Sequence, residues 1–464
     1  MSNEQQPTGL KKSLKLLHVW AIAAGAIFCY LGYYDQFFVG YCGSGTFFAF
    51  FLMAVAVLFI AMVYCELAPM FPHSGAELIY NTVGMNKHVG FFSAWIILAA
   101  WIAVPPTACM IIVSWINHVF GFNGSLTQLI VISIICMCIY FVLSLMDIQV
   151  AGNIQTVMLT IAIGGSILTG ILFIFSGHWD WNNITKDFFS TSLESVNGIP
   201  GWLIGMALLI TPYFGFECVP QLVEDGDFPV KESTKAILMS VVSCSLCYIF
   251  FFFCLAGVSD WKEISQIGDF MTIKFIRDTL GWNIWTIVFG IISIICAIGT
   301  CLLGFWISTV RMIYAMGEHN FLPKSFAKVN KHHQPILPNI LCLVIGIFFL
   351  IMLNISTVMA DFFNLMSFGC SVAYAVTVVS AMRISKKHPE WLIYKIPGGK
   401  FTRIIALVIS IIIAYFCTLG QSTGSWICLG AYCGVGVIIW LWMVFFRWKK
   451  EKVVISTLDG DKEY

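Results

Sequence analysis

The sequence predicts an all-α integral membrane protein of twelve transmembrane helices, arranged as two inverted repeats of five helices plus two more. The composition is the first observation: of 464 residues, 59% are hydrophobic and only 11% are charged, and the mean hydropathy is +0.88. Soluble domains carry about 25% charged residues. The second observation is a series of long apolar segments, and the third is that two of them are interrupted by Gly, Pro or bulky polar residues. We therefore expect no soluble catalytic domain among these residues.

A helix needs about 20 mostly apolar residues to cross a bilayer. Segments of that kind recur along the chain and leave only short loops between them. The predicted spans are 17–39, 46–69, 90–119, 126–146, 153–176, 200–222, 235–257, 283–310, 337–354, 358–382, 403–422 and 425–446.

The interrupted segments are the first and the sixth, which stand at equivalent positions in two groups of five. Matching irregular segments in two halves are typical of transporters built from an inverted repeat with a midplane site. We therefore expect one transmembrane domain, 1–464. Its parts would be a first repeat over 17–176, a second over 200–382, the last two helices over 403–446 and a cytoplasmic tail over 447–464.

The charges predict the orientation. With both termini in the cytoplasm, only four of the 25 Lys and Arg residues fall in outer loops, namely Lys186, Lys262, Lys274 and Arg277. Positive charge gathers on the cytoplasmic side of membrane proteins. The expected location is therefore the plasma or inner membrane, with many crossings and both ends inside. The net charge of +1 gives no sign of a nucleic-acid partner.

The 17 cysteines lie almost entirely inside apolar segments. Two closely spaced pairs, Cys136 with Cys138 and Cys244 with Cys247, lack companion His or Asp ligands, and the two longest outer loops, 177–199 and 258–281, contain no cysteine. We interpret the cysteines as packing residues and expect no metal, no cofactor and no disulfide framework.

The stretch 201–227, GWLIGMALLITPYFGFECVPQLVEDGD, carries the strongest functional signal. Pro212 removes a helix hydrogen bond and Gly215 loosens the backbone beside it. Glu217 follows directly, and a carboxylate at membrane depth is costly unless something pairs with it. A helix broken at the midplane with a charge at the break predicts a transporter binding site.

Four stretches together resemble the amino acid–polyamine–organocation superfamily, in the right order and over nearly the whole chain. They are CELAPMFPHSGAELIYNTVG (65–84), FGFECVPQLVEDGDFPVKESTKAI (214–237), RMIYAMGEHNFLPKSFAKVN (311–330) and NLMSFGCSVAYAVTVVSAMR (364–383), the last followed by KIPGG. The resemblance implies a LeuT-like fold with substrate between the unwound centres of the first and sixth helices. The third, eighth and tenth helices would surround it.

In the sixth segment, the resemblance implies that free carbonyls from Thr211 to Phe214 accept a substrate ammonium. Glu217 has three alternative roles. It pins orphan amides at the break, it carries a coupling proton, or it contacts a substrate cation; the first is the interpretation we favour.

The first segment departs from the family. Relatives usually have a Gly-Ser-Gly-like run whose bare amides hold a substrate carboxylate, and only small residues allow that approach. Counting from Gly25-Ala26-Ile27, the aligned positions are Cys29, Tyr30 and Leu31. Either the break shifts toward Gly25 or Gly32, or the substrate is not held through a carboxylate.

Aromatic side chains are dense near the expected pocket and can cage an amine by cation–π attraction, although packing is the commoner role for any one ring. On the third segment, Pro105 and Pro106 would kink the wall that carries Ala100, Val104 and Thr107. The expected substrate-lining residues are Gly25, Ile27, Phe28, Cys29, Tyr30, Ala100, Val104, Thr107, Thr211, Tyr213, Phe214, Gly215 and Phe305.

Coupling is expected to involve Glu217 and Thr300. Proton-coupled relatives have a lysine in the fifth helix, but its place here, near Ala162, is not basic. Thr300 is a lone hydroxyl for sodium, followed by Cys301, which is a poor ligand for a hard cation. Exchange of one solute for another needs neither ion site.

Together these features predict a secondary transporter that moves an amino acid or small organic amine across the cell membrane by alternating access. Its partners would be the small-molecule substrate and the lipid bilayer. One alternative is symport coupled to an ion, which could be a proton. The other is antiport, in which an amino acid is exchanged for an amine. A membrane enzyme would need a metal set or a nucleophile with a base, and a channel would need polar rings; neither pattern is present in the sequence.

Overall fold

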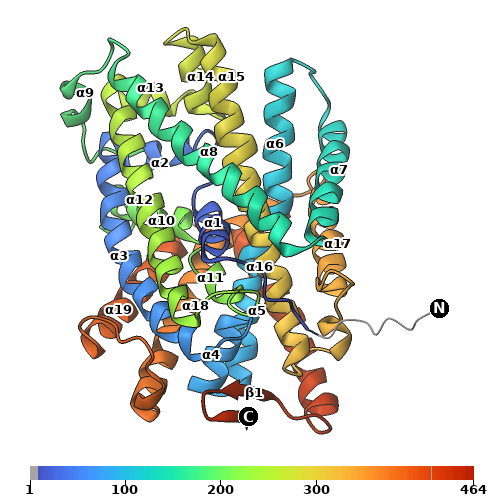
Figure 1. Cartoon of the computed structure of the whole chain (residues 1–464). Coiled ribbons are helices and arrows are strands. Elements are labelled where there is room, and N and C mark those ends of the chain that lie inside the picture. The colour runs from blue at the N-terminus through green and yellow to red at the C-terminus, as the bar shows by residue number, and fades with distance from the viewer. Residues whose placement is uncertain (1–8, 420) are drawn as a thin grey trace.

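The fold is a bundle of helices, as Figure 1 shows for the computed structural model, which describes residues 9–419 and 421–464. Sheet is confined, within these residues, to one small hairpin. The all-α fold class predicted from the sequence is therefore confirmed. The long helices are α3 (Thr46–Leu67), α5 (Lys87–Ile102), α6 (Val104–Phe120), α7 (Leu126–Ser144), α8 (Ile148–Ile174), α12 (Ser233–Val258), α16 (Gly299–Glu318), α17 (Ile336–Met352), α18 (Val358–Lys387), α19 (Lys400–Leu419) and α20 (Thr423–Trp442).

Two predicted segments are each split into half-helices. The first consists of α1 (Leu16–Ile27) and α2 (Asp35–Cys42), and the sixth of α10 (Gly201–Leu208) and α11 (Cys218–Gln221). The eighth combines α15 (Asn283–Gly290), a π-helical stretch over Ile291–Ile298, and α16. The short helices in loops are α4 (Ala76–Gly84), α9 (Trp181–Thr185), α13 (Trp261–Ser265) and α14 (Met271–Asp278).

Ten helical stretches of the described chain are long and apolar enough to cross a membrane. Two further apolar helices, α1 and α17, are shorter and coincide with the first and ninth predicted segments. Each predicted span thus has a helical counterpart. The count of twelve crossings and the inverted repeat remain predictions.

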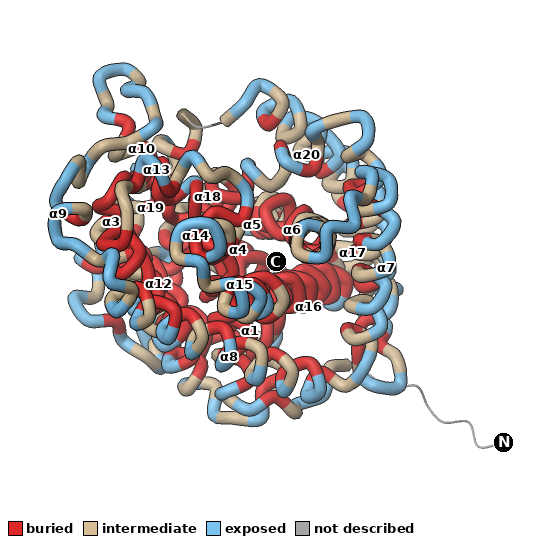
Figure 2. The backbone as a smooth tube through the Cα atoms, turned by 90° about the horizontal axis from the view of Figure 1, so that it is seen from above, coloured by how far each residue is buried: buried red, intermediate tan, exposed pale blue. Residues whose placement is uncertain are grey.

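The burial pattern is that of a protein in lipid. Buried residues line the centre of the bundle and exposed ones its rim (Figure 2). The rim is apolar, since Ile139 on α7 is 57% exposed and Val157 on α8 is 60% exposed. Large contiguous apolar surfaces mark contact with another apolar phase, which here is the bilayer.

The helix α1 lies inside the bundle and packs against α8, α12, α16 and α11. The third segment is interrupted at Ala103, between α5 and α6, and Pro105 and Pro106 fall in the first turn of α6. Proline is tolerated there because the first-turn amides have no partner within the helix. The interruption of the helix coincides with the two prolines, and the kink of this wall remains a prediction.

The C-terminal residues form the antiparallel hairpin of β1 (Val454–Thr457) and β2 (Gly460–Glu463). Ile455 is fully buried, His319 at the end of α16 contacts the Val454 carbonyl at 2.8 Å, and Lys462 lies over the Trp391 ring. The hairpin therefore sits at the same end as the lysine-rich segment 383–403, which joins α18 to α19. We call this end the basic end; α4 also lies there (Figure 1).

Two buried ion pairs tie helices together. Arg403 on α19 makes two hydrogen bonds of 2.6 and 2.7 Å to Glu66 on α3. Arg311 on α16 makes bonds of 2.7 and 3.0 Å to Asp225 in the loop after α11. Paired, hydrogen-bonded charges of this kind are costly to break singly, because the remaining partner stays buried.

We predict that Arg403→Met lowers the free energy of unfolding by about 3–5 kcal/mol, since Glu66 keeps its burial and loses its cation. The double variant Glu66→Leu with Arg403→Met should regain most of that loss. Thermal unfolding of the detergent-purified protein measures both. The control is Lys235→Ala, which removes an exposed pair with Glu232 and should change stability by about 1 kcal/mol or less. Equal effects of Arg403→Met and Lys235→Ala would contradict the prediction.

Candidate functional site

The first helix break runs from Phe28 to Tyr34, between α1 and α2. The last carbonyls of a helix lose the regular partners of its interior. Here Phe28 N donates to Ala24 O at 2.8 Å and Cys29 N to Ile27 O at 3.1 Å, and a neighbouring helix adds side-chain donors. Tyr248 Oη on α12 donates to Ile27 O at 2.7 Å, and Cys244 Sγ donates to Ala24 O at 3.3 Å. The break therefore covers Cys29, Tyr30 and Leu31 rather than shifting back to Gly25.

The glycine used by this break is Gly32, which has a φ of 89°, a value that favours glycine. On the far side, α2 begins at Asp35. Its carboxylate accepts hydrogen bonds from Gly32 N at 3.0 Å and Gln36 N at 3.1 Å, and the Thr272 hydroxyl of α14 also donates to it. The chain's own carboxylate thus occupies the positive end of this half-helix.

The second break lies between α10 and α11 and touches the first. Gly215 has a φ of 139°, and a Cβ there would approach Ala23 O and Ala26 Cβ of α1 to 2.8 Å. Only glycine allows this contact between the two interrupted segments. Pro212 lies in the short 3₁₀ turn Thr211–Tyr213 before it.

Glu217 closes this break with its own side chain. Its Oε2 accepts from Gly215 N at 2.8 Å, which is the contact a pinning role requires. Its Oε1 is buried and has no hydrogen-bond partner among the described residues. Trp101 and Tyr374 face the carboxylate, and their N–H and O–H groups are likewise without partners there. The Glu217 carboxylate thus has two further donors facing it, and its second oxygen forms a hydrogen bond with neither.

A small cavity of about 20 Å³ lies at the first break, room for about one water molecule. Of the residues expected to hold substrate, Cys29, Tyr30, Val104 and Thr107 line it. The lining residues that sequence analysis did not single out for the pocket are Tyr34, Ala108, Ile111, Ile298, Cys301 and Phe363.

The other expected site residues lie around this cavity without lining it. Thr211 lines a neighbouring cavity of about 400 Å³. The Tyr213 hydroxyl donates to Phe50 O on α3 at 2.8 Å. The remaining expected residues, Gly25, Ile27, Phe28, Ala100, Phe214, Gly215 and Phe305, are buried in the surrounding core.

Three aromatic rings line both cavities. Tyr34 and Phe363 stack with centroids 5.4 Å apart and planes 3° apart, and Tyr30 lies 5.2 Å from Tyr34. The larger cavity shares Phe37 and Tyr41 with a third one of about 450 Å³ beside α13. Cavities with shared lining residues thus lie between α13, which is at the end opposite the basic end (Figure 1), and the rings.

The basic end is closed beneath the breaks. Ser13 N and Leu14 N both donate to Asp225 O at 2.9 Å, and Asp227 N donates to Leu14 O at 2.8 Å. Arg311 holds the Asp225 side chain from α16. These contacts join the residue stretch before α1 to the loop after α11.

Thr300 lies where three helices meet. Its hydroxyl is 2.7 Å from Ala297 O and 3.3 Å from Gly25 O, and its carbonyl accepts from Gln155 Nε2 on α8 at 2.8 Å. The side chain that α8 sends to this junction is thus an uncharged amide, two helical turns before Ala162. Sequence analysis missed Gln155, because no spacing signal connects it with Thr300.

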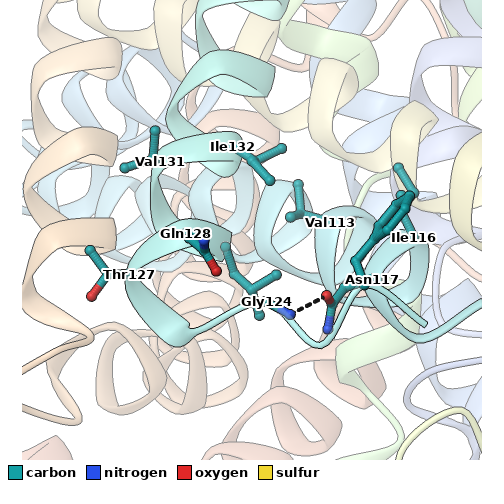
Figure 3. A pocket seen from close by; sticks show the side chains of 10 residues that line it. Val113, Ile116, Asn117, Gly124, Thr127, Gln128, Val131 and Ile132 are labelled. Carbon is teal, nitrogen blue, oxygen red and sulfur yellow. Dashed lines mark hydrogen bonds between the residues drawn. The ribbon is translucent and has the colours of Figure 1, made fainter. Parts of the chain in front are cut away.

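A groove of about 440 Å³ between α6 and α7 is separate from this site (Figure 3). Asn117 there accepts from Gly124 N at 2.9 Å. Its lining residues contain no charged side chain and none of the residues of either helix break.

Comparisons with known proteins agree with this architecture. A model of the amino acid permease family matches residues 14–443. The chain is 24% identical over 428 residues to the gamma-aminobutyric acid permease of Bacillus subtilis (strain 168), which covers 87% of each chain. It is 21% identical over 419 residues to the methylthioribose transporter of the same organism, covering 81% of this chain and 86% of the relative.

The branched-chain amino acid permease BcaP of Bacillus subtilis (strain 168) is 22% identical over 382 residues, or 77% of each chain. The matched family is one of permeases, so the protein is a transporter of amino acids or related organic molecules and not an enzyme. The chain belongs to the amino acid permease family, within the amino acid–polyamine–organocation superfamily.

Proposed function

We propose that this protein moves an amino acid or a small organic amine across the cell membrane by alternating access, with the substrate held between the two helix breaks. The observation that carries the proposal is the contact of the breaks at Gly215, beside a small cavity. Broken helices that meet at mid-depth present free backbone groups to a ligand. In this arrangement both termini are cytoplasmic and the basic end faces the cytoplasm.

The sixth segment would hold the substrate's amino group. Thr211 O accepts a hydrogen bond from Phe214 N at 3.3 Å. The carbonyls of Tyr213 and Phe214 accept no hydrogen bond within the described chain. These carbonyls are acceptors that suit an ammonium. Substrate binding by Cys29, Tyr30 and Thr107 across the cavity would complete the site.

The first break favours substrates held by the amino group over those held by a carboxylate. Asp35 already occupies the amides of Gly32 and Gln36, and a second carboxylate placed there would be repelled. Relatives named for a γ-amino acid and for methylthioribose support a family site that accepts ligands other than α-amino acids.

Ligand-induced stabilisation tests the substrate class. We expect amines and ω-amino acids to raise the thermal unfolding temperature of the purified protein, because a ligand that binds only the folded state stabilises it. At a concentration 100 times Kd, the gain is about 2.7 kcal/mol. Stabilisation by α-amino acids, with no effect of their decarboxylated analogues, would contradict the amine preference.

We further propose solute exchange in place of sodium symport. The α1 carbonyls that could hold a hard cation are already approached by uncharged donors from Cys244, Tyr248 and Thr300. Gln155 adds an amide at the same junction. A sodium ion would have to displace these groups.

Counterflow in proteoliposomes tests the exchange. Vesicles loaded with unlabelled substrate should take up labelled substrate with no sodium or proton gradient, whereas empty vesicles should take up far less. Vesicles loaded with an unrelated sugar are the control. Uptake into empty vesicles that requires a sodium or proton gradient would establish symport and reject exchange.

Glu217→Gln and Glu217→Leu separate the roles of this residue. Glutamine keeps an oxygen for Gly215 N, so we expect exchange to persist with a similar unfolding temperature. Leucine leaves that buried amide without an acceptor, at a cost of about 1–3 kcal/mol. If the glutamine variant folds normally but loses exchange or its pH dependence, the charge is needed and pinning is not the main role.

A further inference from the structure

The buried carboxylates of this protein fall into two classes. Glu66 and Asp225 are each held by an arginine. Glu77 is equally buried, with an exposed fraction of 0%, yet no Lys, Arg or His of the described chain lies within ion-pair distance of it. It lies in the first turn of α4 at the basic end, outside the candidate membrane spans, and sequence analysis did not single it out.

Three elements meet at the Glu77 carboxyl group. Tyr64 Oη on α3 donates to Oε1 at 2.8 Å, and Gln221 Nε2 on α11 donates to Oε2 at 3.1 Å. Gly75 N in turn donates to Gln221 Oε1 at 2.9 Å. The helix α11 is the second half of the broken sixth segment, so this network fastens that half-helix to α3 and α4.

The surroundings of Glu77 offer no positive charge. The titratable groups that face it are Tyr64 on α3, Tyr80 on α4, Glu217 before α11, Cys218 on α11 and Cys370 on α18. All are neutral or acidic, and an unpaired buried carboxylate is strongly disfavoured. Burial raises the pKa of Glu77 to about 8, although the Tyr64 and Gln221 hydrogen bonds act in the opposite direction.

We propose that Glu77 is a proton-binding site that latches α11 at the basic end: it is protonated while Gln221 covers it, and it releases the proton when α11 moves away. The Tyr64 hydroxyl can rotate to accept from the protonated carboxyl group, so no hydrogen bond is lost. In the open state, water would reach the carboxylate and stabilise the charge. The proton binds and leaves on the same side of the membrane, so it controls the rate of opening and supplies no driving force.

Proton binding can be tested without transport, by comparing the unfolding of wild type and Glu77→Gln as a function of pH. A carboxyl group whose pKa is raised in the folded state stabilises the fold at low pH. This contribution is lost as pH rises from the ordinary pKa of 4.5 toward about 8. We expect the stability of Glu77→Gln relative to wild type to increase through that window, by up to about tenfold in the unfolding equilibrium per pH unit.

Tyr64→Phe is the matched variant, because it keeps the carboxyl group and removes one donor to its charged form. In Tyr64→Phe, the pH range over which the stability contribution of Glu77 is lost should therefore extend to higher pH than in wild type. A difference between wild type and Glu77→Gln that is the same at every pH would overturn the proton site, since a merely structural hydrogen bond predicts that result.

The latch rests on the proposed transport function and needs a second measurement. Counterflow into vesicles with the internal side at pH 6 to 9 should vary with internal pH in wild type and be flat in Glu77→Gln. Unchanged pH dependence in Glu77→Gln overturns the latch. A protein that shows the stability window but exchanges no amine or amino acid supports the proton site and contradicts the proposed function.

Discussion

The constraint behind this structure is that a backbone amide or carbonyl inside a bilayer must find a partner within the protein. Every helix break exposes several such groups, so a break is stable only where neighbouring side chains can reach it. Tyr248 and Thr300 donate to carbonyls near the end of α1. Asp35 accepts from the Gly32 amide before α2, and Glu217 accepts from the Gly215 amide at the second break. The packing of α12 and α16 against α1 follows from this need. The same contacts fix where unpaired backbone groups remain for a ligand.

The second break could be predicted from the sequence because its causes are local. Pro212, Gly215 and Glu217 act on the backbone within a few residues of where they stand. The extent of the first break could not be predicted in the same way. Its glycine, Gly32, lies beyond the aligned positions, and the helix ends where Tyr248, far away in the sequence, reaches Ile27 O. Long-range contacts of this kind leave no periodic signal in the chain.

The same limit applies to the cavity and to the helix count. Tyr34 and Phe363 stack across two elements, and neither is unusual in its own segment. The apolar pattern predicted twelve spans, but α1 has only 12 residues and rises about 18 Å. This is less than the hydrocarbon thickness of about 30 Å. If α1, the break and α2 act together as one crossing, the residues of the break supply part of the missing length.

The distribution of charge divides the bundle into fixed and movable parts. Glu66 and Asp225 are bound by arginines, which hold α3 to α19 and α16 to the loop after α11. Two of the buried carboxylates without a cation lie beside α11: Glu217 accepts from the backbone before it, and Glu77 accepts from the side chain of Gln221 within it. Hydrogen bonds to neutral donors are individually weak compared with buried ion pairs. Glu217 and Gln221 are therefore weaker points of attachment than the arginine pairs, and α11 is the element that a substrate at the breaks or a proton at Glu77 can most readily shift.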